Sequence, residues 1–131
     1  METLTTTAAR FLFGIPLIIF GILHFISGTD MEGFMPDPGA LFWVYLSGVA
    51  LVLAGISILV NKFGKQACLL FALMLLIFTI STHAMGILNP DTMLIEIVNT
   101  LKNLLIIGGA LACAGIFVNE KNKQNNLTPK I

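Results

Sequence analysis

The chain has 131 residues, 56% of them hydrophobic, and its seven basic and seven acidic side chains leave no net charge. A water-soluble domain of this length needs a larger polar surface than this composition provides. The neutral charge balance argues against a nucleic-acid partner, and the sequence has neither a GxxxxGK phosphate loop nor a dinucleotide fingerprint.

Four stretches without Asp, Glu, Lys or Arg mark candidate membrane spans; they are residues 11–29, 38–61, 66–90 and 103–119. About 20 apolar residues cross about 30 Å of hydrocarbon as a helix. The last stretch is shorter, but the Lys102 ammonium can extend to the interface, so this helix can begin earlier. We therefore predict an all-α membrane four-helix bundle in a single domain, with helices at about 8–28, 40–61, 66–88 and 96–118 and a polar tail at 119–131.

The first span has Thr7 as its predicted N-cap and ends near Ser27. Pro16 lies inside it and should bend the helix. A cleaved signal peptide ends in small residues, whereas His24 and Phe25 stand in that place. We therefore expect this span to be retained in the membrane.

The later spans are separated by recognisable turn signals. Pro36-Asp37-Pro38-Gly39 should break the chain before the second span, and Phe42, Trp43 and Tyr45 at the start of that span suit the membrane interface. The short turn at 61–65 predicts antiparallel second and third helices, and Asn89-Pro90 should end the third. From Asn119 onward the chain is polar, and we expect it to be frayed.

Basic residues predict the orientation. With four spans, both termini and the 61–65 turn share one side of the membrane, which holds Arg10, Lys62, Lys65, Lys121, Lys123 and Lys130. The other side holds only Lys102, together with Asp30, Glu32, Asp37, Asp91 and Glu96. The positive-inside rule therefore predicts cytoplasmic termini in a multi-pass protein of the bacterial cytoplasmic (inner) membrane.

Small residues recur at helical spacing on three of the spans. On the first span, Arg10, Gly14, Leu17, Gly21, His24 and Gly28 share one face. Because small residues allow helices to approach closely, we predict helix packing at Gly14, Gly21, Gly48, Gly55, Gly108 and Gly115. Arg10 should anchor the inner face by extending to lipid headgroups; pairing with a helix C-terminus or with an anionic partner is the alternative.

Two intramembrane histidines are the candidate site residues. His24 and His83 lie four and five residues before the outer ends of their spans, and so at one depth. With Thr79, Asn99 and Lys102 they would form an outer-leaflet pocket that hydrogen-bonds a quinone-like headgroup or relays protons. In the alternative interpretation each imidazole bonds a carbonyl or hydroxyl and only stabilises packing. A haem held by both rings is a less favoured hypothesis.

The two cysteines predict no redox chemistry. Cys68 and Cys113 lie on separate helices toward the inner side, and the sequence contains no CxxC motif. We expect buried, inert thiols rather than a disulfide. No catalytic residue and no metal site are predicted.

Several segments resemble the DoxX family of small membrane proteins. These are Gly21-Ile22-Leu23-His24-Phe25, Phe34-Met35-Pro36-Asp37-Pro38 and Phe42-Trp43-Val44-Tyr45-Leu46-Ser47-Gly48. Residues 74–83 and 101–115 are similar to the last two spans of that family, in the same order. The sequence departs from the family pattern at one position, because a proline is expected soon after His83 and none is present. The shape of a pocket inferred from the family is therefore uncertain at this position. The resemblance implies a four-helix membrane fold and association with membrane oxidoreductases, among them a thiosulfate:quinone oxidoreductase.

Three functions remain open at this point. The first is a non-catalytic accessory or scaffold subunit of a membrane redox or envelope complex, with a membrane or periplasmic protein partner or as a homo-oligomer. The second is an oxidoreductase subunit that binds quinone, or with less support haem, near His24 and His83. The third is a small transporter, for which the inner half offers few polar residues besides Arg10 and Ser57.

Overall fold

The computed structural model describes residues 2–32 and 39–127 of the chain. They form five helices: α1 (Glu2–Ile26), α2 (Gly28–Glu32), α3 (Ala40–Leu59), α4 (Gly64–Ile87) and α5 (Met93–Leu127). This described part contains helices and no strand, which confirms the predicted all-α class. All the helices except α2 are long and apolar enough to cross a membrane, so the chain is a multi-pass membrane protein whose spans lie in a lipid bilayer.

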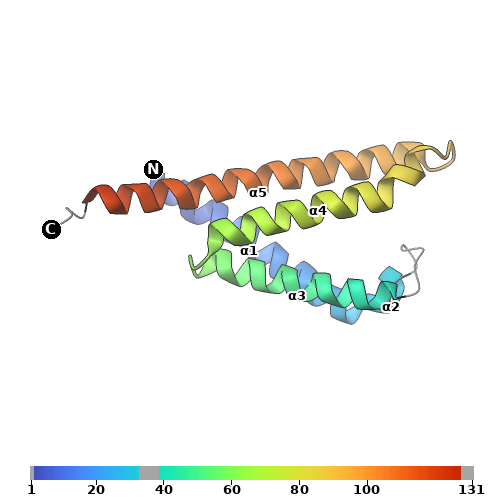
Figure 1. Ribbon diagram of the computed structural model, residues 1–131, viewed down its shortest axis with the longest axis horizontal. Helices are drawn as coiled ribbons and strands as arrows, with labels where there is room; N and C mark the ends of the chain where they lie inside the picture. Colours follow the sequence, from blue (N-terminus) through green and yellow to red (C-terminus); the bar gives the residue numbers. More distant parts are fainter. Residues whose placement is uncertain (1, 33–38, 128–131) are drawn as a thin grey trace.

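The four long helices form two antiparallel hairpins, because α1 packs along α3 and α4 packs along α5. Figure 1 shows two layers that meet near the turn between α3 and α4 and diverge toward α2 and the turn between α4 and α5. Both termini point to the first of these ends. We call it the basic end, since it holds Arg10, Lys62, Lys65, Lys121 and Lys123, and we call the other the opposite end.

Two helices extend further than the sequence pattern predicts. α1 begins at Glu2, so Thr7 lies inside the helix and is not its N-cap. α5 continues to Leu127, so the expectation of a frayed tail is wrong for residues 119–127. Neither extension contains Gly or Pro, the residues that interrupt a helix most strongly, so these two segments can continue the helices.

The connections also differ from the predicted ones. A short helix, α2, occupies part of the expected first loop, while the Pro36–Pro38 breaker lies outside the described residues. Gly39 precedes α3 with φ of 114°, a left-handed conformation that favours glycine. α3 ends at Leu59 and α4 begins at Gly64, so the turn between them is residues 60–63.

The hairpin of α1 and α3 is held by two facing pairs of glycines. A Cβ atom on Gly21 would lie 2.8 Å from the Gly48 carbonyl oxygen, and one on Gly55 would lie 2.7 Å from the Gly14 carbonyl oxygen. These distances are shorter than van der Waals contact, so the two backbones approach as closely as glycine allows. On α5, by contrast, a Cβ on Gly108 or Gly115 would meet no described atom within 4 Å. The packing predicted at those two positions is therefore absent from the described structure.

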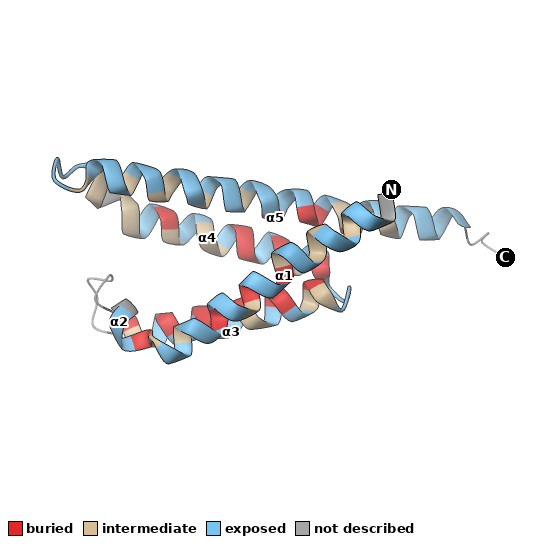
Figure 2. Ribbon diagram, turned by 180° about the vertical axis from the view of Figure 1, so that it is seen from behind, coloured by how far each residue is buried: buried red, intermediate tan, exposed pale blue. Residues whose placement is uncertain are grey.

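The hydrophobic core lies where the two hairpins meet. Its buried cluster includes Leu51 and Ile58 from α3, Cys68 and Phe71 from α4, and Phe117 from α5. Figure 2 shows buried positions near this crossing and along the contact between α1 and α3 as far as α2, while the outward faces of α4 and α5 are exposed along most of their length. Such exposed apolar faces are expected of helices that contact lipid. The hairpins are thus joined near the basic end and separate toward the opposite end.

Candidate ligand site between the helix hairpins

A cavity of about 500 Å³ lies between the two hairpins, and we call it the hairpin cleft. All four long helices line it, and most of the lining is apolar, including Phe13 and Phe20 from α1 and Phe78 from α4. Its three polar lining residues are His24 from α1, Ser47 from α3 and Asn103 from α5. A predominantly apolar cavity of this size with a few polar groups is typical of a small-molecule site.

The imidazole of His24 is oriented by its own helix. Nδ1 lies 2.8 Å from the Phe20 carbonyl oxygen and donates a hydrogen bond to it. The Phe20 ring packs edge-to-face against the imidazole, with 4.7 Å between the ring centroids. With its proton on Nδ1, the neutral ring presents Nε2 as a hydrogen-bond acceptor. His24 thus lines the cleft with one ring nitrogen satisfied by its own helix and the other left as an acceptor.

Asn103 is oriented from the other hairpin. Its Nδ2 donates to Thr79 Oγ1 over 3.0 Å, and the Thr79 hydroxyl donates in turn to the Leu75 carbonyl over 2.6 Å. This chain fixes the amide group while leaving its second N–H and its carbonyl oxygen for another partner. One turn toward the opposite end, Thr100 has a buried hydroxyl without a partner among the described residues. Thr100 and Asn103, three residues apart, thus place two polar side chains on one face of α5.

Ser47 contributes less to the cleft. Its hydroxyl is buried and donates to the Val44 carbonyl over 2.8 Å. A serine that bonds the preceding turn of its own helix is already satisfied. The polar groups left for a ligand therefore come from His24 on one hairpin and Asn103 on the other.

His83 does not line this cleft. Its Nδ1 contacts the Glu96 Oε2 atom across the α4–α5 hairpin, with both side chains largely shielded from solvent. Beside them, the Thr92 hydroxyl donates to the Gly86 carbonyl over 2.9 Å. The structure thus gives His24 and His83 separate partners. A haem with two histidine ligands would need both rings in one cavity, and only His24 reaches the hairpin cleft.

The remaining predicted site residues fall into two groups. Thr79 is buried and belongs to the site through its hydrogen bond with Asn103. Asn99 and Lys102 do not line the cleft, and Lys102 is exposed. The sequence interpretation missed Asn103, although it is the first residue of the last uncharged stretch, where an amide at membrane depth is itself a signal.

Arg10 joins three helices at the basic end. Its Nε and Nη2 atoms donate to the Ile58 and Leu59 carbonyls at the end of α3, over 3.3 and 3.2 Å. Its Nη1 lies 3.9 Å from the Glu120 carboxylate of α5, and the guanidinium lies 5.5 Å from the centroid of the Phe117 ring. Of the roles considered for Arg10, pairing with a helix C-terminus matches these contacts, because the last carbonyls of a helix lack partners of their own.

The two cysteines are closer than their positions in the sequence indicate. Cys68 of α4 and Cys113 of α5 are both free and both buried in the same core cluster. No group of three or more His, Cys, Asp or Glu side chains that could hold a metal ion occurs in the described part of the chain. The thiol pair therefore contributes to the packing of α4 against α5.

Searches with protein-family models, curated proteins and solved structures find no match to this chain.

Proposed function

We propose that this chain is a DoxX-like accessory subunit of a membrane redox assembly and that it holds a quinone-type molecule in the hairpin cleft. The supporting observation is the pair formed by His24 and Asn103, which line one apolar cavity from opposite hairpins. The chain's role in this proposal is binding and positioning. Electron transfer belongs to a membrane or periplasmic partner, as the family resemblance implies.

The chemistry of the two side chains suits a quinone. A quinone ring is flat and apolar with an oxygen at each end, so it needs apolar walls and one polar group near each oxygen. The free N–H of Asn103 can donate to one oxygen. Neutral His24 accepts from a quinol hydroxyl at Nε2, and the protonated ring donates to a quinone oxygen. His24 can therefore form a hydrogen bond with either the quinone or the quinol.

The test uses the full chain, purified in mild detergent and titrated with a short-tailed benzoquinone. We expect His24→Ala and Asn103→Leu each to weaken binding by about tenfold, since each removes a hydrogen bond in an apolar site. His83→Gln is the matched control, because His83 does not line the cleft, and it should bind like the wild type. Absence of saturable binding, or unchanged affinity in both cleft variants, would contradict the proposal.

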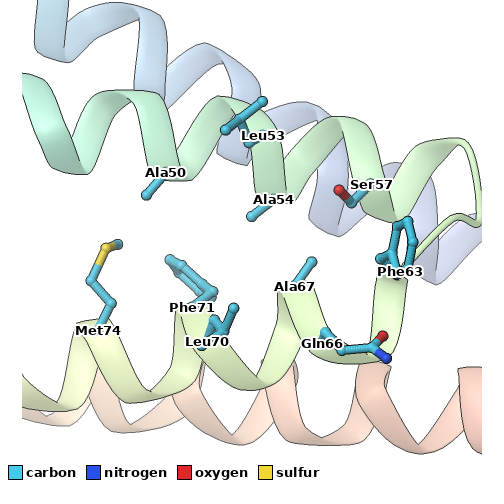
Figure 3. A pocket seen from close by; sticks show the side chains of 10 residues that line it. All are labelled: Ala50, Leu53, Ala54, Ser57, Phe63, Gln66, Ala67, Leu70, Phe71 and Met74. Atoms are coloured by element: carbon cyan, nitrogen blue, oxygen red, sulfur yellow. The ribbon is translucent and has the colours of Figure 1, made fainter.

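A second candidate function is a scaffold for a partner's membrane helix, and a different cavity supports it. Figure 3 shows a cavity of about 340 Å³ between α3 and α4, which Ala50, Ala54 and Ala67 face and which Phe63 closes at the turn. Small side chains allow another helix to approach closely. Replacing Ala50 and Ala67 by Leu fills this cavity and should release a co-purified membrane partner while quinone binding is kept. If the partner is retained, the scaffold contact lies elsewhere.

We also propose that the basic end faces the cytoplasm of a bacterial cell, because cytoplasmic loops of membrane proteins are enriched in Lys and Arg. Green fluorescent protein fused after residue 131 should then fluoresce, and alkaline phosphatase fused at the same place should be inactive. A reporter inserted in the turn between α4 and α5 should give the reverse result. The opposite pattern of reporter activity would mean that the basic end faces away from the cytoplasm. The proposal for the hairpin cleft does not depend on this orientation.

A further inference from the structure

A second large cavity, of about 670 Å³, lies at the basic end between the start of α4 and the end of α5. Phe63, Lys65 and Gln66 line it from the turn and α4, and Phe117 and Lys121 line it from α5. About half of its lining is polar, in contrast to the hairpin cleft. No step of the proposed function uses this cavity.

The cavity carries unbalanced positive charge. Among the described residues, neither Lys65 nor Lys121 forms an ion pair. Glu120 is the only carboxylate in the lining, and it is already engaged by Arg10 at 3.9 Å and by the Asn61 amide at 3.4 Å. Two lysine side chains therefore line the cavity without a negative partner among the described residues.

The depth of these lysines identifies the kind of anion. Lys65 directly precedes the uncharged stretch 66–90, and Lys121 follows the uncharged stretch 103–119 by two residues. Both ammoniums therefore lie where the hydrocarbon ends and the headgroups begin. The Phe63 ring is exposed beside them and gives the cavity an apolar wall. A ligand with a phosphate next to an apolar body matches this arrangement better than a fully hydrated ion.

We propose that this cavity binds the headgroup of an anionic phospholipid, with the phosphate between Lys65 and Lys121. Basic pockets between membrane helices at the headgroup level bind acidic lipids in this way. The first-turn amides of α4 border the same cavity and, as at any helix start, have no carbonyl partner within the helix. The bound lipid bridges α4 and α5 at the end where the two hairpins are joined.

Native mass spectrometry of the full chain, titrated with phosphatidylglycerol or phosphatidylcholine in detergent, tests the proposal. The wild type should bind phosphatidylglycerol about thirtyfold more tightly than phosphatidylcholine, and Lys65→Gln/Lys121→Gln should lose this preference. The double variant Lys62→Gln/Lys102→Gln removes the same charge from residues that do not line the cavity and should keep the preference. Lys65→Arg/Lys121→Arg should keep it as well.

Three outcomes would contradict the proposed lipid site. One is a preference that survives in Lys65→Gln/Lys121→Gln, and another is an equal loss in the Lys62→Gln/Lys102→Gln control. The third is displacement of the lipid by millimolar inorganic phosphate, which would identify free phosphate as the ligand. Circular dichroism and thermal unfolding of each variant show whether it is folded, and both substituted lysines are exposed.

Discussion

At the basic end, Arg10 connects α1, α3 and α5 through two backbone carbonyls and the Glu120 carboxylate, and the core cluster packs directly beneath it. At the opposite end, the His83–Glu96 pair connects only α4 and α5. The first set of polar contacts crosses between hairpins, and the second stays within one hairpin. In the described structure the two hairpins are therefore linked by side chains at the basic end and diverge toward the opposite end, and His24 and Asn103 line the cleft between them.

This difference shows how a small bundle can be stable and still offer a binding site. Contacts that join the hairpins are concentrated at the basic end, and there the polar groups of Arg10 and Glu120 are used by the protein itself. Toward the opposite end, His24 and Asn103 are each oriented by one bond to their own hairpin. Each lines the apolar cleft and keeps hydrogen-bonding capacity beyond that one bond. Substitutions in one region at a time should therefore affect stability and binding differently.

The largest effect is expected for Gly55→Ala, within the hairpin of α1 and α3. The new Cβ would lie 2.6 Å from an Ile18 side-chain carbon and 2.7 Å from the Gly14 carbonyl oxygen, so the helices must move apart. We expect a loss of about 3 kcal/mol in the free energy of unfolding, measured by denaturant titration in detergent micelles. Gly108→Ala is the control, because its Cβ meets no described atom within 4 Å, and it should change the stability little. Equal effects of the two changes would mean that α1 and α3 are not in close contact.

An intermediate effect is expected for Arg10→Ala at the basic end. The change removes the side-chain donor from the Leu59 carbonyl and one of two partners from the Ile58 carbonyl and the Glu120 carboxylate, which both keep a contact with Asn61. This should cost about 2 kcal/mol. Arg10→Lys should recover only part of the lost stability, because an ammonium group cannot reproduce the forked hydrogen bonding of the guanidinium. The measurement is the same unfolding titration, with Lys102→Ala as a control at an exposed cation. A stability unchanged from the wild type would show that Arg10 does not hold the hairpins together.

The smallest effect is expected for His83→Leu at the opposite end. Loss of the imidazole leaves the Glu96 carboxylate unpartnered, which should cost about 1 kcal/mol because both side chains retain some solvent contact. Hydrogen exchange should report faster exchange at the end of α4 and the start of α5, with no change around Arg10. Faster exchange at the basic end would mean that the two ends are not independent.

The sequence predicted the number and order of the spans, because hydropathy depends on composition along each helix. It misplaced the helix ends, since a polar segment such as residues 119–127 without Gly or Pro continues a helix as well as an apolar one does. The orientation of the bundle in the membrane stays a prediction.

The site was only partly predictable because depth does not specify rotation or pairing. His24 and His83 were placed at one level, yet their partners are Phe20 and Glu96, and only His24 lines the cleft. Glycine spacing has the same limit: it identifies a face of a helix and says nothing of which neighbour covers it. Gly14 and Gly55 face each other across two helices, whereas Gly108 faces outward from the described structure.

The pairing of neighbours along the chain also sets the order in which the protein can be assembled during synthesis. α1 and α3 are complete before α4 is made, and each hairpin needs only its own two helices to pair, so both can form as they enter the membrane. The contact between Arg10 and Glu120 is different, because it joins the first long helix to the last. It can form only after all four long helices have been made, so it reports that the two hairpins have come together.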